Sequence, residues 1–412
     1  MKLKQIRVDG YKNLINCVIN LGDFNVLVGP NNSGKSNLLE AVQILWPMCF
    51  GDEKLRKGVL NGLTPRLTLD SSICHLQKHK NKPMTIGIAF ETTESRGHWL
   101  VDYEAKVQCD DSENKNGTFV SEILAAKVTS KPGPARKYIW RQGKNLEVIG
   151  KKYKITGNNS SLLAINSLYP DFEGLPPELK TFVKSINSIG MTRIFAISPT
   201  ELRRDIDEEK PIDGIRVSSF DLSLVLDNIK EEAKYYTLFR ESLCDILDLE
   251  DIIFEVQVKT SPNKGKGKKQ LSKRMRYFLT RRTGDQFSFI EEYSDGTLLV
   301  IAILEALFSK NARGPILCLE ELENCLHPAA VEKLLRFLQD HSDDCPVLIT
   351  THSPYILNGI RPEDVNVAVV DETGAAHFEK VKNSRQLREY LNKNLMSFGE
   401  LLASDFQSFR EG

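Results

Sequence analysis

The spacing of apolar side chains changes several times along the chain. Residues 2–8 alternate as in a strand, and "FNVLVG" (24–29) is almost continuously apolar, which predicts a buried strand. "SNLLEAVQILW" (36–46) has the spacing of a helix, and Pro47 predicts where that helix ends. The chain therefore opens with two strands, a glycine-rich turn and a helix.

The middle of the chain has two further patterns. From residue 84 to 155, short alternating runs are separated by turn-rich segments such as "DDSENKNG" and "KPGPAR", which predicts an antiparallel sheet. Helical spacing dominates from 160 to 248. Residues 251–260 and 274–282 are expected to form strands around a polar loop.

After residue 296 the expected order is helix, strand, helix, strand, helix, strand. The strands "PILCLE", "PVLIT" and "NVAVV" are continuously apolar, as in a parallel sheet covered on both faces. "VNVAVVDETGAAHFEKV" predicts a hairpin, and "SRQLREYLNKNLMSFGELLASDF" predicts terminal helices.

We therefore predict an α/β fold in which residues 1–412 form a single head. Its expected parts are a mostly parallel core from 1–50 and 290–375, an antiparallel β subdomain at 84–156, an inserted helical and β arm at 157–290, and a C-terminal hairpin with helices at 376–412.

Composition indicates the cellular compartment of the protein but does not favour any particular partner. The 412 residues include 55 Lys or Arg and 55 Asp or Glu, so any nucleic-acid contact must come from a local patch. The eight cysteines form no C-x-x-C pair, which is typical of reduced cysteine in the cytosol. The N-terminus is not a signal peptide, and no apolar run approaches membrane-spanning length. We expect a cytoplasmic protein without a membrane partner.

"GPNNSGKS" (29–36) follows the buried strand and precedes the helix, and it matches the phosphate-loop pattern G-x-x-x-x-G-K-[ST]. In such a loop, backbone N–H groups surround the phosphates of ATP, the lysine reaches the β- and γ-phosphates, and the serine hydroxyl binds Mg²⁺. The residues expected to bind ATP here are Gly29, Pro30, Asn31, Asn32, Ser33, Gly34, Lys35, Ser36 and Asn37.

"ILCLEELENCLHP" (316–328) supplies the carboxylates that hydrolysis requires. Glu320 emerges at the carboxyl edge of a buried strand and is expected to hold Mg²⁺ together with Ser36. Glu321 is expected to orient and deprotonate the attacking water. His352, after the strand in "VLITTHSPYIL", can hydrogen-bond the γ-phosphate or that water. "YSDGTLLVIAIL" begins a helix with a second anion site, formed by Ser294, Gly296 and Thr297.

The order of these motifs resembles the ABC-type P-loop ATPase heads of the RecF, SMC and OLD group. Within it, "SDGT", "EELENCLHP" and "TTHSPYIL" resemble segments of the small prokaryotic AAA-family ATPases of anti-phage defence systems, of the Septu PtuA and PARIS AriA types. This resemblance implies two ATP molecules sandwiched between two heads, hence a homodimer or higher homo-oligomer. Glu321 then matches the catalytic glutamate and His352 the switch histidine. Lys35 of the phosphate loop is the third residue expected to be catalytic.

The resemblance also implies that Ser294, Gly296 and Thr297 act on ATP bound by the other subunit, and that Asn324 and His327 lie along the dimer interface. Three departures from the family pattern indicate slow hydrolysis. Glu320 replaces the usual aspartate, Leu322 and Cys325 replace a proline and a glycine, and no clear glutamine loop follows the first helix.

The segment Lys264–Arg282 carries nine lysines and arginines interleaved with Tyr277 and Phe278. It is either a solvated loop or a DNA or RNA contact. The first positions to test are Lys266, Lys268, Lys269, Arg274 and Arg276.

OLD nucleases continue into a Toprim domain, but only fifty or so residues follow "THSPYIL" here, and they contain no D-x-D carboxylates. We therefore predict an ATP-hydrolysing sensor or regulatory subunit of a defence complex, with a separate effector protein such as a nuclease or toxin. The alternatives are a RecF-like DNA-repair ATPase and a nucleotide-gated scaffold with little turnover.

Overall fold

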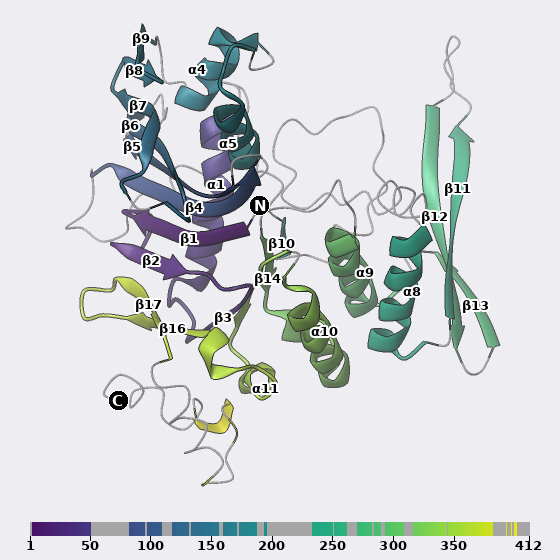
Figure 1. Ribbon diagram of the computed structural model, residues 1–412. Helices are drawn as coiled ribbons and strands as arrows, with labels where there is room; N and C mark the ends of the chain where they lie inside the picture. Colours follow the sequence, from purple (N-terminus) through teal and green to yellow (C-terminus); the bar gives the residue numbers. More distant parts are fainter. Residues whose placement is uncertain are drawn as a thin grey trace. The chain divides into compact units, whose positions relative to one another are not determined.

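The computed structural model describes two compact units, each considered by itself (Figure 1). Unit 1 comprises Met1–Thr192, Gly314–Ile316 and Pro362–Arg385, and unit 2 comprises Arg193–Arg313, Leu317–Arg361 and Gln386–Gly412. The residues described are 2–50, 82–94, 97–108, 118–131, 133–155, 160–170, 173–187, 193–195, 233–249, 251–261, 270–281, 284–289, 293–308, 316–343, 345–381, 393, 397 and 399–401.

An eight-stranded sheet with the order β2-β1-β4-β5-β6-β7-β8-β9 forms most of unit 1. Every neighbouring pair is antiparallel, which confirms the antiparallel sheet predicted for residues 84–155. The strands are β1 (Lys2–Asp9), β2 (Cys17–Asn20), β4 (Met84–Glu94), β5 (Gly97–Gln108), β6 (Thr118–Val128), β7 (Arg136–Gln142), β8 (Asn145–Val148) and β9 (Lys151–Lys154).

Three helices of unit 1 cover one face of this sheet: α1 (Lys35–Phe50), α4 (Ser161–Leu168) and α5 (Pro177–Asn187). Helix α1 contacts α4, α5, β1 and β4. The ring of Phe182 on α5 meets Trp99 and Tyr138 edge-on, with centroids 5.6 and 5.4 Å apart. The opposite face of β5–β9 carries the half-buried and exposed positions of the alternating pattern.

The predicted end of the first helix at Pro47 is wrong, because α1 continues to Phe50. A proline inside a helix removes one backbone hydrogen bond and crowds the preceding turn. Pro47 lies in the last turn of α1, so the hydrogen bond that it cannot donate is lost close to the end of the helix, and the helix continues for only three residues after it.

The remaining strands of unit 1 lie beside the phosphate-loop strand. β3 (Phe24–Val28) pairs parallel with β16 (Val365–Val370), and β16 pairs antiparallel with β17 (Ala376–Lys380). The hairpin predicted for this region is thereby confirmed.

In unit 2, three parallel strands lie side by side: β10 (Arg193–Phe195), β14 (Leu317–Glu320) and β15 (Val347–Thr351). The helices are α8 (Ala233–Leu247), α9 (Asp295–Phe308), α10 (Pro328–His341) and α11 (Pro354–Leu357). A separate antiparallel sheet contains the two predicted strands and a third that the pattern did not reveal: β11 (Asp251–Ser261), β12 (Gln270–Arg281) and β13 (Gly284–Phe289).

Most of the predicted C-terminal helices lie outside the described residues, as does 219–232 of the predicted helical arm. Among the helices that are described, none combines the length and the apolar character needed to cross a membrane.

A buried ion pair ties the sheet of unit 1 to its helices. Glu122 on β6 is 0% exposed and Arg141 on β7 is 1% exposed, and Arg141 donates to the Glu122 carboxylate over 2.8 Å. That carboxylate also accepts from the Tyr103 hydroxyl and from the N–H and hydroxyl of Ser161, at 2.7–2.8 Å. One buried charge thus joins three strands to the first turn of α4.

We expect Glu122→Ala to lower the free energy of unfolding by about 3–5 kcal/mol, because the guanidinium of Arg141 would remain buried without its carboxylate. Chemical denaturation measures the change. The control is Glu147→Ala at a half-buried position of β8, which should cost well under 1 kcal/mol. Equal losses in the two variants would contradict a special role for this pair.

Candidate functional site

The phosphate loop of unit 1 connects the end of β3 to the start of α1. Asn32 and Gly34 have positive φ angles of 62° and 90°, which curl the backbone around the lysine. Lys35 is 5% exposed, and its ammonium donates to the carbonyls of Gly29 and Pro30 at 2.7 and 2.9 Å and to the Ser33 hydroxyl at 3.2 Å. To bind a phosphate, Lys35 must exchange at least one of these loop oxygens for a phosphate oxygen.

The loop is held in place by the β16–β17 hairpin. A Cβ atom on Gly29 would lie 2.7 Å from the carbonyl oxygen of Ala368, and one on Gly34 would lie 2.6 Å from the Cβ of Ala376. Both distances are shorter than van der Waals contact, so packing requires both glycines of the pattern, and at Gly34 the positive φ requires glycine as well.

The sequence analysis missed a polar segment beside this loop. Asn13 accepts a hydrogen bond from the side chain of Asn37 at 2.7 Å and donates to the carbonyl of Asn32 at 3.4 Å. Lys12 forms an ion pair with Glu40 of α1. "GYKNL" (10–14) follows a strand and contains turn and polar residues, which is a weak signal of a loop that could contact the site.

Unit 2 brings together the second group of predicted residues. The backbone of Glu321 has φ 51°, an uncommon conformation for a side-chain-bearing residue, and its N–H donates to Thr350 O at 2.9 Å. Oε1 of Glu321 lies 3.1 Å from Nε2 of His352, and these side chains are 35% and 32% exposed. Oε2 accepts from the Asn324 amide at 2.6 Å. Glu321 and His352, predicted from separate motifs, are therefore direct neighbours.

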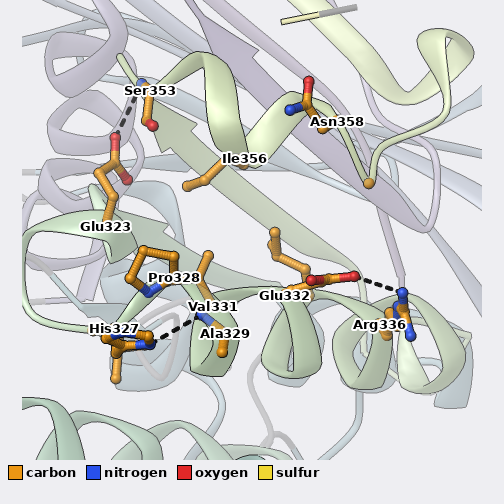
Figure 2. A pocket seen from close by; sticks show the side chains of 13 residues that line it. Glu323, His327, Pro328, Ala329, Val331, Glu332, Arg336, Ser353, Ile356 and Asn358 are labelled. Atoms are coloured by element: carbon orange, nitrogen blue, oxygen red, sulfur yellow. Dashed lines mark hydrogen bonds and ion pairs between the residues drawn. The ribbon is translucent and has the colours of Figure 1, made fainter. Parts of the chain in front are cut away.

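Glu323 was not predicted as a site residue, yet it organises the segment after β15. Its Oε1 accepts from the Thr351 hydroxyl at 2.6 Å, from the His352 N–H at 3.1 Å and from the Ser353 N–H at 3.2 Å. Figure 2 shows this contact with Ser353 at one end of a pocket between α10 and the α11 segment. Only the acidic character of "EELEN" signals Glu323 in the sequence, and that does not distinguish it from a solvated residue.

The pocket has a volume of about 770 Å³, and Val331 and Ile356 face it from opposite sides (Figure 2). His327, expected along a dimer interface, is the N-cap of α10, and its Nδ1 accepts from the Ala329 N–H at 3.3 Å. Its side chain is exposed, as is that of Asn324.

The "SDGT" segment lies at the N-terminus of α9 in the same unit. The Ser294 hydroxyl caps the helix by accepting from the Thr297 N–H at 3.2 Å, and it lies 2.8 Å from the Thr297 hydroxyl. A Cβ on Gly296 would fall well inside van der Waals contact with the carbonyl oxygen of Cys325. Burial, together with the nearby Asp295 carboxylate, raises the pKa of the Cys325 thiol. The start of α9 therefore packs on the turn that follows Glu321.

Two groups of site residues result. The phosphate loop belongs to unit 1, whereas Glu320, Glu321, His352 and Ser294 belong to unit 2, so their convergence on one nucleotide stays a prediction. Of the basic segment, 264–269 and 282 lie outside the described residues, while Arg274 and Arg276 are on β12.

The residues expected to hold Mg²⁺ offer the right kind of donor. Among the residues that the structure describes, no group of three His, Cys, Asp or Glu side chains could hold a metal ion. Nucleotide-bound Mg²⁺ does not need such a group, because it takes one or two protein oxygens and completes its shell with phosphates and water. The Ser36 hydroxyl and the Glu320 carboxylate are donors of this type.

Comparison with known proteins places both halves of the chain among ATPase domains. A family model described as "AAA domain, putative AbiEii toxin, Type IV TA system" matches residues 110–358, and one described as "AAA ATPase domain" matches residues 1–173. A search of curated proteins found no match.

Among solved structures, an SMC head bound to the C-terminal winged-helix domain of ScpA is similar, with a TM-score of 0.53 and 12% identity over 94% of this chain and 100% of that one. The SMC head domain from Thermotoga maritima covers 93% of this chain and 100% of its own at 12% identity, with a TM-score of 0.43. The first of these likenesses supports the predicted α/β fold of the ABC ATPase head type.

We expect Gly296→Ala to destabilise the protein by about 1–3 kcal/mol, because the new methyl group meets the backbone of the turn after Glu321. The same change at Gly359 is the matched control, since a Cβ there meets nothing within 4 Å. Thermal or denaturant unfolding gives the difference. Wild-type stability and ATPase rate in Gly296→Ala would show that this contact is unimportant.

Proposed function

We propose that this chain, which belongs to the AAA-domain family whose model matches residues 110–358, is the ATP-hydrolysing sensor or regulatory subunit of a prokaryotic anti-phage defence complex. It would bind ATP between two copies of itself and control a separate effector protein. The observation that carries the hydrolytic part is the 3.1 Å contact between Glu321 and His352 at the ends of adjacent parallel strands.

Binding would begin at the phosphate loop. The N–H groups of the loop and of the first turn of α1 provide the positive end of a helix, and Lys35 contributes a cation already placed at the centre of the loop. Ser36 and Glu320 would hold Mg²⁺, which neutralises charge on the phosphates when it is bound. Glu320, one methylene longer than aspartate, alters the reach of that carboxylate and favours slow turnover.

Glu321 is the proposed general base. Asn324 donates to one carboxylate oxygen and His352 lies beside the other, so the side chain is positioned from two directions. A carboxylate positioned in this way can accept a proton from water as the water attacks the γ-phosphate. His352 can then bind the γ-phosphate or the same water.

Glu323 acts as a positioning residue in this scheme. It accepts the backbone N–H groups of His352 and Ser353, and therefore fixes the direction in which the His352 side chain leaves the backbone. The α9 cap, with Ser294 and Thr297 exposed or half-exposed, would complete the site on the second copy.

The proposal that this chain controls a partner protein rests on the family match and not on a binding site in the structure. The description of the matching family names a "putative AbiEii toxin" of a type IV toxin–antitoxin system, and such a system has a second component, which supports a partner protein of some kind. The repair-ATPase alternative depended mainly on the basic segment Lys264–Arg282, whose side chains are outside the described part of the chain.

Glu321→Gln should reduce phosphate release at least about 100-fold and leave ATP binding intact, because the amide is similar in shape but cannot accept the proton. An ATP-dependent dimer should accumulate, visible by light scattering after gel filtration. Glu241→Gln, at an exposed position of α8, is the control and should match wild type. Unchanged phosphate release from Glu321→Gln would remove Glu321 from the role of base.

Glu323→Ala should lower kcat about tenfold or more with little change in KM, because His352 loses its backbone anchor while the phosphate loop is unaffected. Glu323→Gln retains one acceptor oxygen and should recover much of the rate. Steady-state phosphate release measures both. A loss of stability with unchanged kcat would indicate a purely structural carboxylate.

A further inference from the structure

Charge is balanced over the whole chain but not along β6–β9. From Lys127 to Lys154, nine residues are Lys or Arg and one, Glu147, is acidic, whereas the chain average predicts about four of each in a stretch of this length. Arg141 is the buried partner of Glu122. The other eight cations are all exposed: Lys127, Lys131, Arg136, Lys137, Lys144, Lys151, Lys152 and Lys154.

The strand register gathers half of these cations around an aromatic residue. Residues directly opposite each other on neighbouring strands lie on the same face of a sheet, and so do residues two apart on one strand. Trp140 of β7 lies opposite Ile123 and Glu147, Lys137 lies opposite Ala125, and Lys152 lies opposite Glu147. The half-buried Trp140 therefore shares one face with four lysines, here called the basic face: Lys127, Lys137, Lys152 and Lys154.

The basic face is turned away from the helices of unit 1. The alternate positions of the same strands, such as Leu124 and Ile139, are buried, and Glu122 on that side is bonded to Ser161 of α4. The basic face is thus the solvent face of β6–β9 (Figure 1).

The lysines of the basic face are not neutralised by their surroundings. The acids on the adjoining strand β5 are already engaged, because Arg7 lies 2.6 Å from Asp102 and 3.8 Å from Glu104. In the part of the chain that the structure describes, none of the four lysines forms an ion pair, although Glu147 lies opposite Lys152. Positive potential consequently remains on this surface.

Protection of a sheet edge does not explain the whole pattern. Proteins place lysines on edge strands to block pairing with other chains, and this accounts for Lys152 and Lys154 on β9. Lys127 and Lys137 lie on β6 and β7, which have neighbours on both sides. Edge protection also leaves the aromatic side chain of Trp140 among the lysines unexplained.

We propose that the basic face binds single-stranded nucleic acid, with the four lysines against backbone phosphates and one base stacked on Trp140. Proteins that bind single-stranded nucleic acid combine cations, which contact the phosphates, with aromatic rings, on which the flat apolar surface of any base can stack. Strand β7 spans about 20 Å, which accommodates a few nucleotides. The surface lies outside the phosphate loop, so this binding does not depend on the proposed ATPase function.

The test measures fluorescence anisotropy of labelled 20-nucleotide oligo(dT) and oligo(U) with the full chain from 50 to 200 mM salt. In Lys137→Gln/Lys152→Gln/Lys154→Gln, affinity should fall at least tenfold, and the slope of log K against log salt should lose about two units, from three lost single-strand contacts. Trp140→Ala should weaken binding about tenfold, and Trp140→Phe should recover most of it. Exposed lysines of unit 1 that are not on β5–β9 provide the control, Lys82→Gln/Lys184→Gln/Lys380→Gln, which should bind like wild type.

All variants should keep the basal ATPase rate and the unfolding temperature, and Lys35→Ala should keep oligonucleotide binding. Oligo(dT) and oligo(U) together distinguish DNA from RNA as the preferred strand. The proposal is overturned if neither strand binds at 50 mM salt, or if the triple variant keeps wild-type affinity and slope. It is also overturned if a 20-base-pair duplex binds more tightly than both strands, or if polyglutamate binds as tightly, which would indicate an acidic protein partner.

Discussion

The phosphate loop depends on close packing against a hairpin that follows it by more than 300 residues. Gly29 and Gly34 leave no room for a side chain because Ala368 and Ala376 occupy that space. Chain segments from both ends of unit 1 must therefore be in place before the loop has its final shape. A loop held in this way is preorganised, so little ordering remains to oppose the binding of phosphates.

In unit 2, two carboxylates two residues apart have different tasks. Glu321 has a strained backbone, and the Asn324 amide and His352 hold its side chain from two sides. Strain of this kind persists only where neighbouring contacts stabilise it, and it is concentrated at functional sites. Glu323 instead binds the backbone after β15 and therefore stabilises the partner of Glu321.

Features set by local sequence could be predicted, and features set by tertiary contacts could not. Most of the strands, the phosphate loop and α9 follow from periodicity and glycine spacing, which are local, whereas the short strands β2, β10 and β13 were not predicted. Glu323 and Asn13 act on segments distant in sequence, and no pattern identifies their partners. The buried Glu122 looked like any polar residue of an alternating strand. The basic face was missed because its lysines are scattered in sequence and meet only through strand register.

The same contacts link the two surfaces of unit 1 that we associate with ligands. Helix α1 begins at Lys35 and packs against α4, whose Ser161 is bonded to Glu122 on β6. Glu122 holds Arg141 on β7, the strand that presents Trp140 and Lys137 on its other face. Continuous packing alone does not make an allosteric path, because coupling requires an element with two arrangements that both ligands bias. Helix α1 is the element in which we would look for such a change, because it begins in the phosphate loop and packs against α4, the helix bonded to Glu122.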